Sequence, residues 1–141
     1  NLYTVHSRKL CPVGWHVPSD EEWTILSKYL SQNGYCYDGT TSQYKIAKAL
    51  ASTSGWVSST VVGTPGNTDY PEYRNKSNFT ALPSGRRALR SFNGSGYNCW
   101  WWSCSSNSSN DYTRYLYSHD VYLHWGAEQA YYGLSVRCLK D

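Results

Sequence analysis

The most regular alternation of apolar and polar positions predicts a helix over residues 20–32. The apolar residues that recur there at helical spacing are Trp23, Leu26 and Leu30. Ser19 and Glu22 have the spacing of a capping box, in which the serine hydroxyl accepts from a helical amide and the glutamate side chain accepts from the amide of the cap. Asn33-Gly34 then provides a stop signal, so the helix is expected to end there.

A second, shorter helix is predicted over residues 42–51. Its buried residues are expected to be Ile46, Ala47 and Leu50. After residue 55 turn formers become frequent, and short segments with strand patterning lie between them. The run Trp100-Trp101-Trp102 predicts a central strand with two buried faces, and the alternation over residues 134–138 predicts a final strand.

A hairpin is predicted from residues 114–117 and 121–125, joined by a turn at 118–120. Successive side chains of a strand point to opposite faces, so two rows are expected. The row expected to face the core contains Leu116, Val121, Leu123 and Trp125. The row expected to face outward contains Tyr115, Tyr117 and Tyr122, with His119 and His124. Two helices near the N-terminus, then short antiparallel strands and long loops, indicate an α+β fold in one domain over residues 1–141.

The composition of residues 93–132 differs from that of the rest of the chain: this region contains no lysine and is rich in tyrosine, serine and asparagine. Tyrosine gives a large, stiff contact at low entropic cost, and serine and asparagine adapt their hydrogen bonds, as in antibody binding surfaces. We therefore expect a ligand-binding surface in this region; for each residue the alternative is that it simply packs. The candidates on the strands and adjoining loops are Tyr97, Asn98, Asn107, Asn110, Tyr112, Arg114, Tyr115, Tyr117, His119, Tyr122, His124 and Tyr131.

The charge pattern argues against nucleic acid as a partner. The formal net charge is +3, and the one basic cluster, Arg86, Arg87 and Arg90, is narrower than the stripe that a nucleic-acid site needs. No apolar run approaches the roughly 18–20 residues of a membrane span. No signal peptide is visible, and a chain that begins at Asn1 without methionine suggests that targeting information lies outside it.

Five cysteines are present, at positions 11, 36, 99, 104 and 138, and none forms a Cys-x-x-Cys pair. A zinc site is therefore not expected, and the odd number leaves at least one thiol outside any intramolecular bridge. His119, Asp120 and His124 have irregular spacing for metal ligands and are better explained as part of the surface. Neither a catalytic triad with a nucleophile elbow nor a phosphate-binding loop occurs in the sequence, so no enzyme activity and no cofactor are expected.

Several segments, in the right order along nearly the whole chain, resemble one bacterial family. The first runs from Cys11-Pro12-Val13-Gly14-Trp15-His16 to Trp23, and the second is Lys45-Ile46-Ala47-Lys48-Ala49-Leu50 before Trp56. The others are Asn78-Phe79-Thr80-Ala81-Leu82-Pro83-Ser84-Gly85-Arg86-Arg87, Trp101-Trp102-Ser103, and Gly133-Leu134-Ser135-Val136-Arg137-Cys138-Leu139-Lys140-Asp141. This pattern is similar to the Fibrobacter succinogenes major paralogous (FISUMP) domain.

The resemblance implies a C-type-lectin-like fold in an exported or lipid-anchored bacterial surface protein. Some domains of this kind are targets of diversity-generating retroelements, which would make residues 93–132 a variable region. Calcium-dependent sugar binding is not expected, because the Glu-Pro-Asn and Trp-Asn-Asp ligand motifs of such lectins are missing. Glycan binding without calcium stays open.

The resemblance also implies a disulfide between Cys11 and Cys138, since lectin-like folds bring their chain ends together; two buried thiols are the alternative. Cys99 and Cys104 depart from the family pattern, and they would bridge each other or one of them would pair with Cys36. They also invite comparison with formylglycine-generating copper enzymes, although the flanking residues differ from the motif of those enzymes.

The resulting hypothesis is a non-catalytic module, such as an adhesin tip, that binds a protein or glycan on a cell or phage surface. A purely structural domain of a surface protein is the alternative, and a copper enzyme is the least favoured reading.

Overall fold

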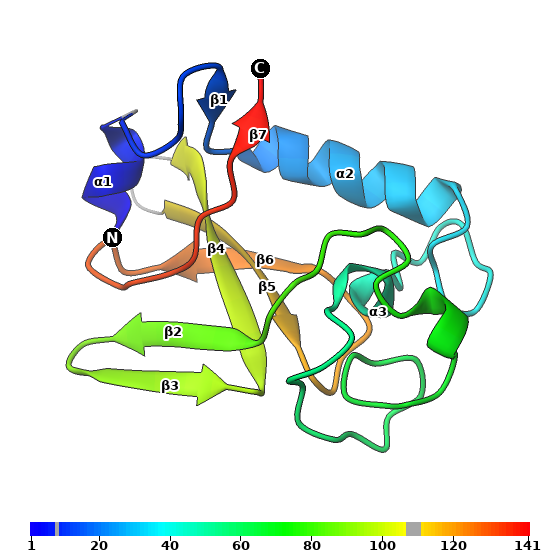
Figure 1. Cartoon of the computed structure of the whole chain (residues 1–141). Coiled ribbons are helices and arrows are strands. Elements are labelled where there is room, and N and C mark those ends of the chain that lie inside the picture. The colour runs from blue at the N-terminus through cyan, green and yellow to red at the C-terminus, as the bar shows by residue number, and fades with distance from the viewer. Residues whose placement is uncertain (8, 107–110) are drawn as a thin grey trace.

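The computed structural model describes residues 1–7, 9–106 and 111–141, and for Asp111 the backbone alone. A five-stranded sheet has the order β3-β2-β4-β5-β6, and β1 pairs with β7 in a separate ribbon (Figure 1). The helices are α1 (Leu2–His6), α2 (Asp20–Gln32), α3 (Ala47–Leu50) and the 3-10 turn η1 (Pro71–Tyr73). The strands are β1 (Trp15–His16), β2 (Ser84–Ala88), β3 (Ser91–Ser95), β4 (Asn98–Ser106), β5 (Asp111–Tyr117), β6 (His124–Glu128) and β7 (Leu139–Lys140).

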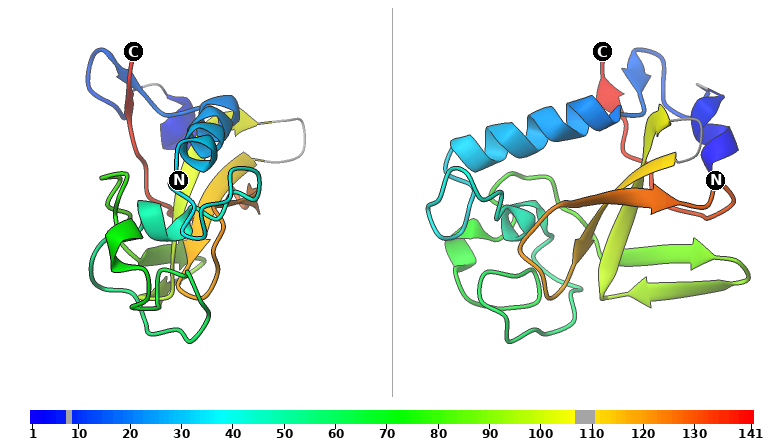
Figure 2. Two further views of the ribbon diagram at one scale, coloured as in Figure 1. Left: turned by 90° about the vertical axis from the view of Figure 1, so that its right-hand side faces the viewer. Right: turned by 180° about the vertical axis from the view of Figure 1, so that it is seen from behind.

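The fold is α+β, as the sequence predicts, but its main sheet is mixed. β2 and β4 pair in parallel through Gly85 and Cys99, so the prediction of antiparallel strands alone was wrong. The sheet curls, and the loops of residues 52–83 and the β2–β3 hairpin lie at opposite ends of the molecule (Figures 1 and 2). The connection between β2 and β4 consists only of β3 and its turns, and local patterning carries no signal for a parallel contact there.

The first predicted helix is confirmed as α2. Ser19 accepts a hydrogen bond from the amide of Glu22, and the Glu22 carboxylate accepts one from the amide of Ser19, which completes the capping box. Trp23 and Leu30 are buried against the sheet. The hydrogen bond from the Ser19 amide is the main reason why the pKa of Glu22 lies below its ordinary value.

The second predicted helix is shorter than expected, and one helix was not predicted. Only Ala47–Leu50 is helical in the predicted range, because Tyr44 takes a left-handed backbone with φ of 54° that a helix cannot contain. The buried residues Ile46, Ala47 and Leu50 are those that the pattern indicated. The additional helix, α1, is a short turn capped by Asn1.

The tryptophan run forms the predicted central strand, β4, and it serves two separate cores. Trp101 packs against Trp23 and Phe79 beneath α2, with ring centroids 5.8 and 5.5 Å away. Trp102 points to the other face and packs with Leu2 and other apolar residues from both ends of the chain. Both faces of the sheet are therefore covered at this strand.

The predicted hairpin exists, but its second strand begins later than expected. β6 starts at His124, and residues 118–123 form a loop in which the carbonyl of Val121 accepts a hydrogen bond from the amide of Ala47. Trp125 was expected in the core and is instead 67% exposed, so that prediction was wrong. The final strand predicted over residues 134–138 is also absent as a strand: Ser135 makes only an isolated bridge with Trp101, and β7 follows it.

Two basic side chains, the buried Lys48 and the half-buried Arg74, organise the long loops after α3. The ammonium group of Lys48, with no exposed surface, forms an ion pair with Asp69 and donates to the carbonyl of Asn67 at 2.9 Å. Arg74 donates to the carbonyls of Pro65 and Asn67. Burial lowers the pKa of both Lys48 and Arg74 from their ordinary values. The loop carbonyls that would otherwise lack partners are thus satisfied by cations.

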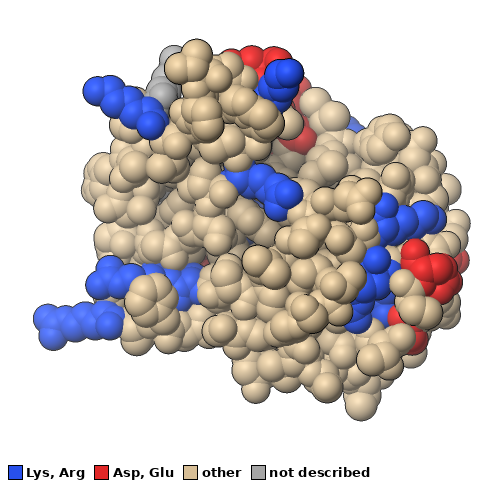
Figure 3. Space-filling model, in the orientation of Figure 1, with Lys and Arg blue, Asp and Glu red and all other residues tan. Residues whose placement is uncertain are grey.

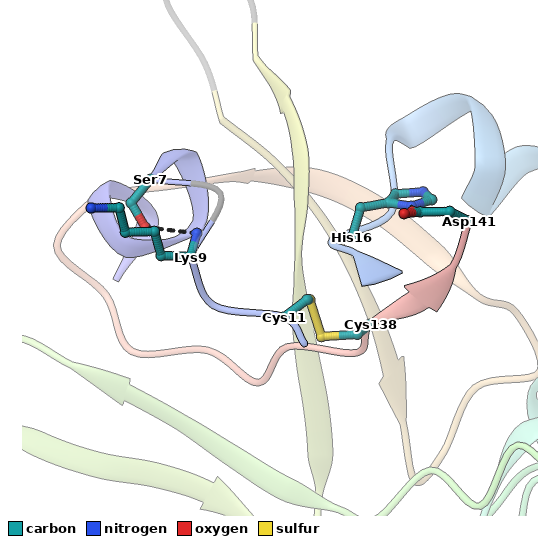
Figure 4. The surroundings of a disulfide bond; sticks show 6 residues. All are labelled: Ser7, Lys9, Cys11, His16, Cys138 and Asp141. Atoms are coloured by element: carbon teal, nitrogen blue, oxygen red, sulfur yellow. Dashed lines mark hydrogen bonds and ion pairs between the residues drawn. A yellow bond between two sulfur atoms is a disulfide. The ribbon is translucent and has the colours of Figure 1, made fainter. Parts of the chain in front are cut away.

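The two ends of the chain are joined covalently by the expected disulfide, Cys11–Cys138 (Figure 4). Next to it, β1 pairs with β7, and His16 lies between two carboxylates. Its Nδ1 is 2.6 Å from Asp141 Oδ1, and its Nε2 is 3.0 Å from Glu22 Oε1. The disulfide and the histidine therefore link the start of the chain, α2 and the last residues.

The second disulfide that the sequence left open does not form. Cys36 and Cys99 are buried thiols, which excludes a Cys99–Cys104 bridge and a bridge to Cys36. Cys99 and Cys104 lie at opposite ends of the buried part of β4, and Cys104 is exposed. Burial raises the pKa of the Cys99 thiol far above its ordinary value, so this thiol stays protonated at neutral pH.

The contacts of His16 give a testable pH dependence. Hydrogen bonds to Asp141 and then to Glu22 raise the pKa of His16 above 6.5. Because the folded pKa is raised, the stabilisation is fully present below the ordinary pKa and is lost as pH rises through the folded value. An NMR titration of the His16 ring should give a midpoint above 6.5, and Asp141→Asn should move it down; an unchanged midpoint in Asp141→Asn would contradict the assignment.

Candidate functional site

One face of the sheet carries a continuous row of aromatic side chains next to the Trp102 core. Trp100, Tyr115 and His124 are direct neighbours across β4, β5 and β6, because the register pairs Trp100 with Tyr115 and Tyr115 with His124. The ring centroids of Trp100 and Tyr115 are 4.0 Å apart, and those of Tyr115 and His124 are 5.1 Å apart at an interplanar angle of 11°. The strand register thus stacks three rings from three strands.

The row extends in both directions from this stack. Tyr117 has ring contacts with Tyr115, His119 and His124, and Tyr122 meets the edge of His124. At the other end Arg86 lies over Trp100, with the guanidinium carbon 4.4 Å from the ring centroid, and also over Tyr132. We call this set the aromatic ridge; its members are Arg86, Trp100, Tyr115, Tyr117, His119, Tyr122, His124, Tyr131 and Tyr132.

The aromatic ridge has a buried base and an exposed margin. Trp100 is buried, while Tyr115, Tyr117 and His124 are half-buried. Burial is the main reason why the pKa of Tyr115 is raised. His119, Tyr122 and Tyr131 form the exposed margin. A partner that approaches this face would meet phenol and imidazole edges held in place by the rings beneath them.

An ion pair stiffens one end of the aromatic ridge. Arg86 on β2 contacts the carboxylate of Glu128 on β6 while its plane lies over Trp100. The planar guanidinium can pair with a carboxylate and stack on a ring at the same time, which lysine cannot do equally well. The ion pair thereby links β2 to the edge strand β6 across the ridge.

The remaining candidates from the sequence lie elsewhere. Tyr112 and Arg114 lie on the other face of β5, beneath the start of α2. Arg114 is only 6% exposed and donates to the Asp20 carboxylate at 2.6 and 2.9 Å. Tyr97 is exposed in the turn before β4, and Asn98 accepts a hydrogen bond from the indole of Trp100. Asn107 and Asn110 lie outside the described residues.

A family model, the Fibrobacter succinogenes major domain, matches residues 1–140. The chain belongs to this family. No curated protein and no solved structure matches the chain. In this Fibrobacter succinogenes major domain the tyrosine-rich region therefore has to be interpreted from its own geometry.

His124 Nε2 is 3.1 Å from Asp120 Oδ2, at an angle that makes no hydrogen bond. Among residues 1–7, 9–106 and 111–141 no group of three or more histidine, cysteine, aspartate or glutamate side chains could hold a metal ion. No described helix is long and apolar enough to cross a membrane. Lys and Arg side chains are dispersed over the face seen in Figure 3 and form no continuous stripe.

Three members of the ridge were missed by sequence reasoning: Arg86, Trp100 and Tyr132. Trp100 was assigned to the core, and it is buried, but the half-buried ring of Tyr115 stacks on it. Arg86 was assigned only to a basic cluster too narrow for nucleic acid, and the carboxylate that holds it is 42 residues away in sequence. Only the register of β2, β4 and β6 brings these side chains together, and one sequence contains no signal for that register.

Proposed function

We propose that this domain is a non-catalytic recognition module whose ligand surface is the aromatic ridge. The observation that carries the proposal is the unbroken contact of tyrosine and histidine rings across β4, β5 and β6, with an exposed margin at His119, Tyr122 and Tyr131. The proposed partner is a protein or glycan on a cell or phage surface, and the proposed setting is an exported bacterial surface protein. The Cys11–Cys138 disulfide is compatible with an extracellular location.

Pre-organisation supports this reading. Ring stacking already restricts the rotamers of Tyr115, Tyr117 and His124, so binding would cost less side-chain entropy than on a mobile surface. Tyrosine combines a broad apolar face with a hydroxyl, and residues of this kind dominate the affinity of many interfaces. A few positions at the margin of the ridge are therefore expected to carry most of the binding energy.

A redox or copper enzyme is the least favoured alternative. The Cys99 thiol is buried and its pKa is raised, whereas a reactive cysteine needs access and a lowered pKa. A purely structural domain remains the main competitor, in which the ridge would only fill space. The exposure of Tyr122 and Tyr131 favours recognition over that reading.

The proposal includes a single C-type-lectin-like domain with a variable region over residues 93–132. The joined chain ends and the long loops beside the sheet are in keeping with such a fold. The variable region is tested at the gene: a neighbouring reverse transcriptase with a template repeat that matches residues 93–132 is expected. Sibling genes that are identical over these residues would contradict diversification.

A triple variant tests the aromatic ridge directly. Tyr117→Ala, His119→Ala and Tyr122→Ala together should abolish binding on an array of glycans and of host and bacterial surface proteins. Trp100 and Tyr115 remain in place, so the melting temperature is expected to fall by no more than about 5 °C. The readouts are array fluorescence and a thermal melt by circular dichroism.

The matched control is Tyr29→Ala, which removes an exposed tyrosine from α2, away from the ridge. It should leave every array signal unchanged. Retained binding in the triple variant would overturn the proposed surface. A collapse of the fold would show instead that the ridge is structural.

A further inference from the structure

A groove lies on the opposite face of the sheet, between the first half of α2 and strands β5 and β6. Its volume is about 600 Å³, within the range of small-ligand sites. It is a different surface from the aromatic ridge, because successive residues of a strand point to opposite faces. Arg114 and Trp125, which are paired across β5 and β6, line the groove, whereas Tyr115 and His124 next to them belong to the ridge.

The floor of the groove is a fixed ion pair. Arg114 donates from Nε and Nη2 to the same oxygen of Asp20, Oδ1, and from Nη2 to the hydroxyl of Thr24 at 3.0 Å. Within the described part of the chain, no hydrogen bond involves Asp20 Oδ2 or Arg114 Nη1. The pair therefore presents a carboxylate acceptor and a guanidinium donor side by side, with no net charge.

The wall of the groove contains exposed aromatic side chains. Trp125 is 67% exposed although it lies on the core face of the sheet, so a large flat ring borders the groove without a covering residue. Tyr44, also exposed, reaches the groove from a backbone with φ of 54°, a conformation that is costly for a bulky residue. Strain of this kind is commonly retained where it positions a functional side chain.

We propose that this groove binds a neutral sugar residue of a glycan. The ring face of the sugar stacks on Trp125, and its hydroxyls bond to Asp20 Oδ2 and Arg114 Nη1 at the floor. A sugar hydroxyl both donates and accepts, so one vicinal pair satisfies a carboxylate and a guanidinium together. The hydroxyls of Thr24 and Ser27, which also line the groove, donate to backbone carbonyls. The oxygen of Thr24 already accepts from Arg114, so Ser27 is the better acceptor for a further sugar hydroxyl.

The chemistry of the lining favours a neutral sugar over a charged ligand. Asp20 and Arg114, the charged residues of the lining, already neutralise each other. A carboxylate on the ligand would be repelled by Asp20, an amine would be repelled by Arg114, and the groove has no net charge to offset either repulsion. The remaining lining is either hydroxyl-bearing or apolar. That division matches a sugar, which has an apolar ring face and a polar rim.

Saturation-transfer NMR with defined monosaccharides tests this proposal. The probes are the methyl glycosides of glucose, galactose, mannose and N-acetylglucosamine, with methyl glucuronide as the charged match to glucose. At least one neutral glycoside should receive saturation, with an affinity in the millimolar range that such small ligands allow. Trp125→Ala should weaken it at least about tenfold, since the stacking face is removed. Trp125→Phe should retain part of the affinity.

The control separates this groove from the aromatic ridge. Tyr122→Ala, on the ridge, should leave glycoside binding unchanged, while Trp125→Ala should leave binding of a ridge ligand unchanged. Trp125 is exposed, so its loss is expected to leave the fold intact, as circular dichroism would verify. Any of three results would overturn the proposal: no neutral glycoside binds, Trp125→Ala binds as well as the native domain, or methyl glucuronide binds as tightly as the glucose derivative.

Discussion

Replacement of both Cys11 and Cys138 by serine is expected to lower the free energy of unfolding by about 3–5 kcal/mol. The bridge closes a loop with a sequence separation of 127, and a cross-link over such a length removes many conformations from the unfolded chain. In the folded state β1–β7 pairing and the contacts of His16 already hold these segments together. The loss should therefore come mainly from the unfolded state, with little change in the native structure.

Urea unfolding followed by tryptophan fluorescence measures this loss. Dithiothreitol should destabilise the native protein by a similar amount and should have no effect on the double serine variant. That comparison is the control, because it separates the bridge from the thiols buried elsewhere. A loss below about 1 kcal/mol would show that the bridge constrains the unfolded chain far less than its length implies.

Lys48→Met is expected to cost about 3–5 kcal/mol, because it leaves the Asp69 carboxylate without its buried cation. The carbonyl of Asn67 would lose one of its two donors and keep the other, Arg74. The structural change caused by Lys48→Met should be confined to the segments near Lys48, although the loss of stability is large. Gly66 belongs to the loop that Lys48 holds, and its amide donates to the carbonyl of Ser118. Ser118 begins the segment that carries His119 and Tyr122. Hydrogen exchange should therefore accelerate around residues 61–69 and 118–123.

A double variant distinguishes a lost ion pair from lost packing. Removal of one member of a buried pair leaves a charge unpaired, whereas replacement of both is tolerated better. Lys48→Met with Asp69→Asn should thus be more stable than Lys48→Met alone, since asparagine keeps an oxygen for the amide of Gly63. If the double variant is less stable than Lys48→Met, the ion pair is not the source of the effect.

Local signals in the sequence were sufficient to predict some helices and strands. The capping box and the spacing of Trp23 and Leu30 specify α2 within one segment, and the tryptophan run specifies a strand with two covered faces. The Cys11–Cys138 bridge followed from the resemblance to a family whose membership is now established. These features depend on neighbouring residues or on the resemblance to that family.

The errors share a physical cause, which is that a partner far away in sequence decides the role of a residue. Alternation placed Trp125 on the core face correctly but could not show that α2 leaves that place uncovered. Arg114 has the pattern of a surface residue, and Asp20, 94 positions away, makes it a buried one. Lys48 likewise has the pattern of a solvated helix position until the carbonyls of the following loop are brought over it.

The alternation along β5 has a consequence for protein engineering. Randomisation of Tyr115 and Tyr117 would alter only one side of the sheet, and randomisation of Tyr112 would alter only the other. Two libraries could therefore be built on one seven-residue strand and selected independently against two different targets. A display scaffold of this type would be bispecific without a second domain.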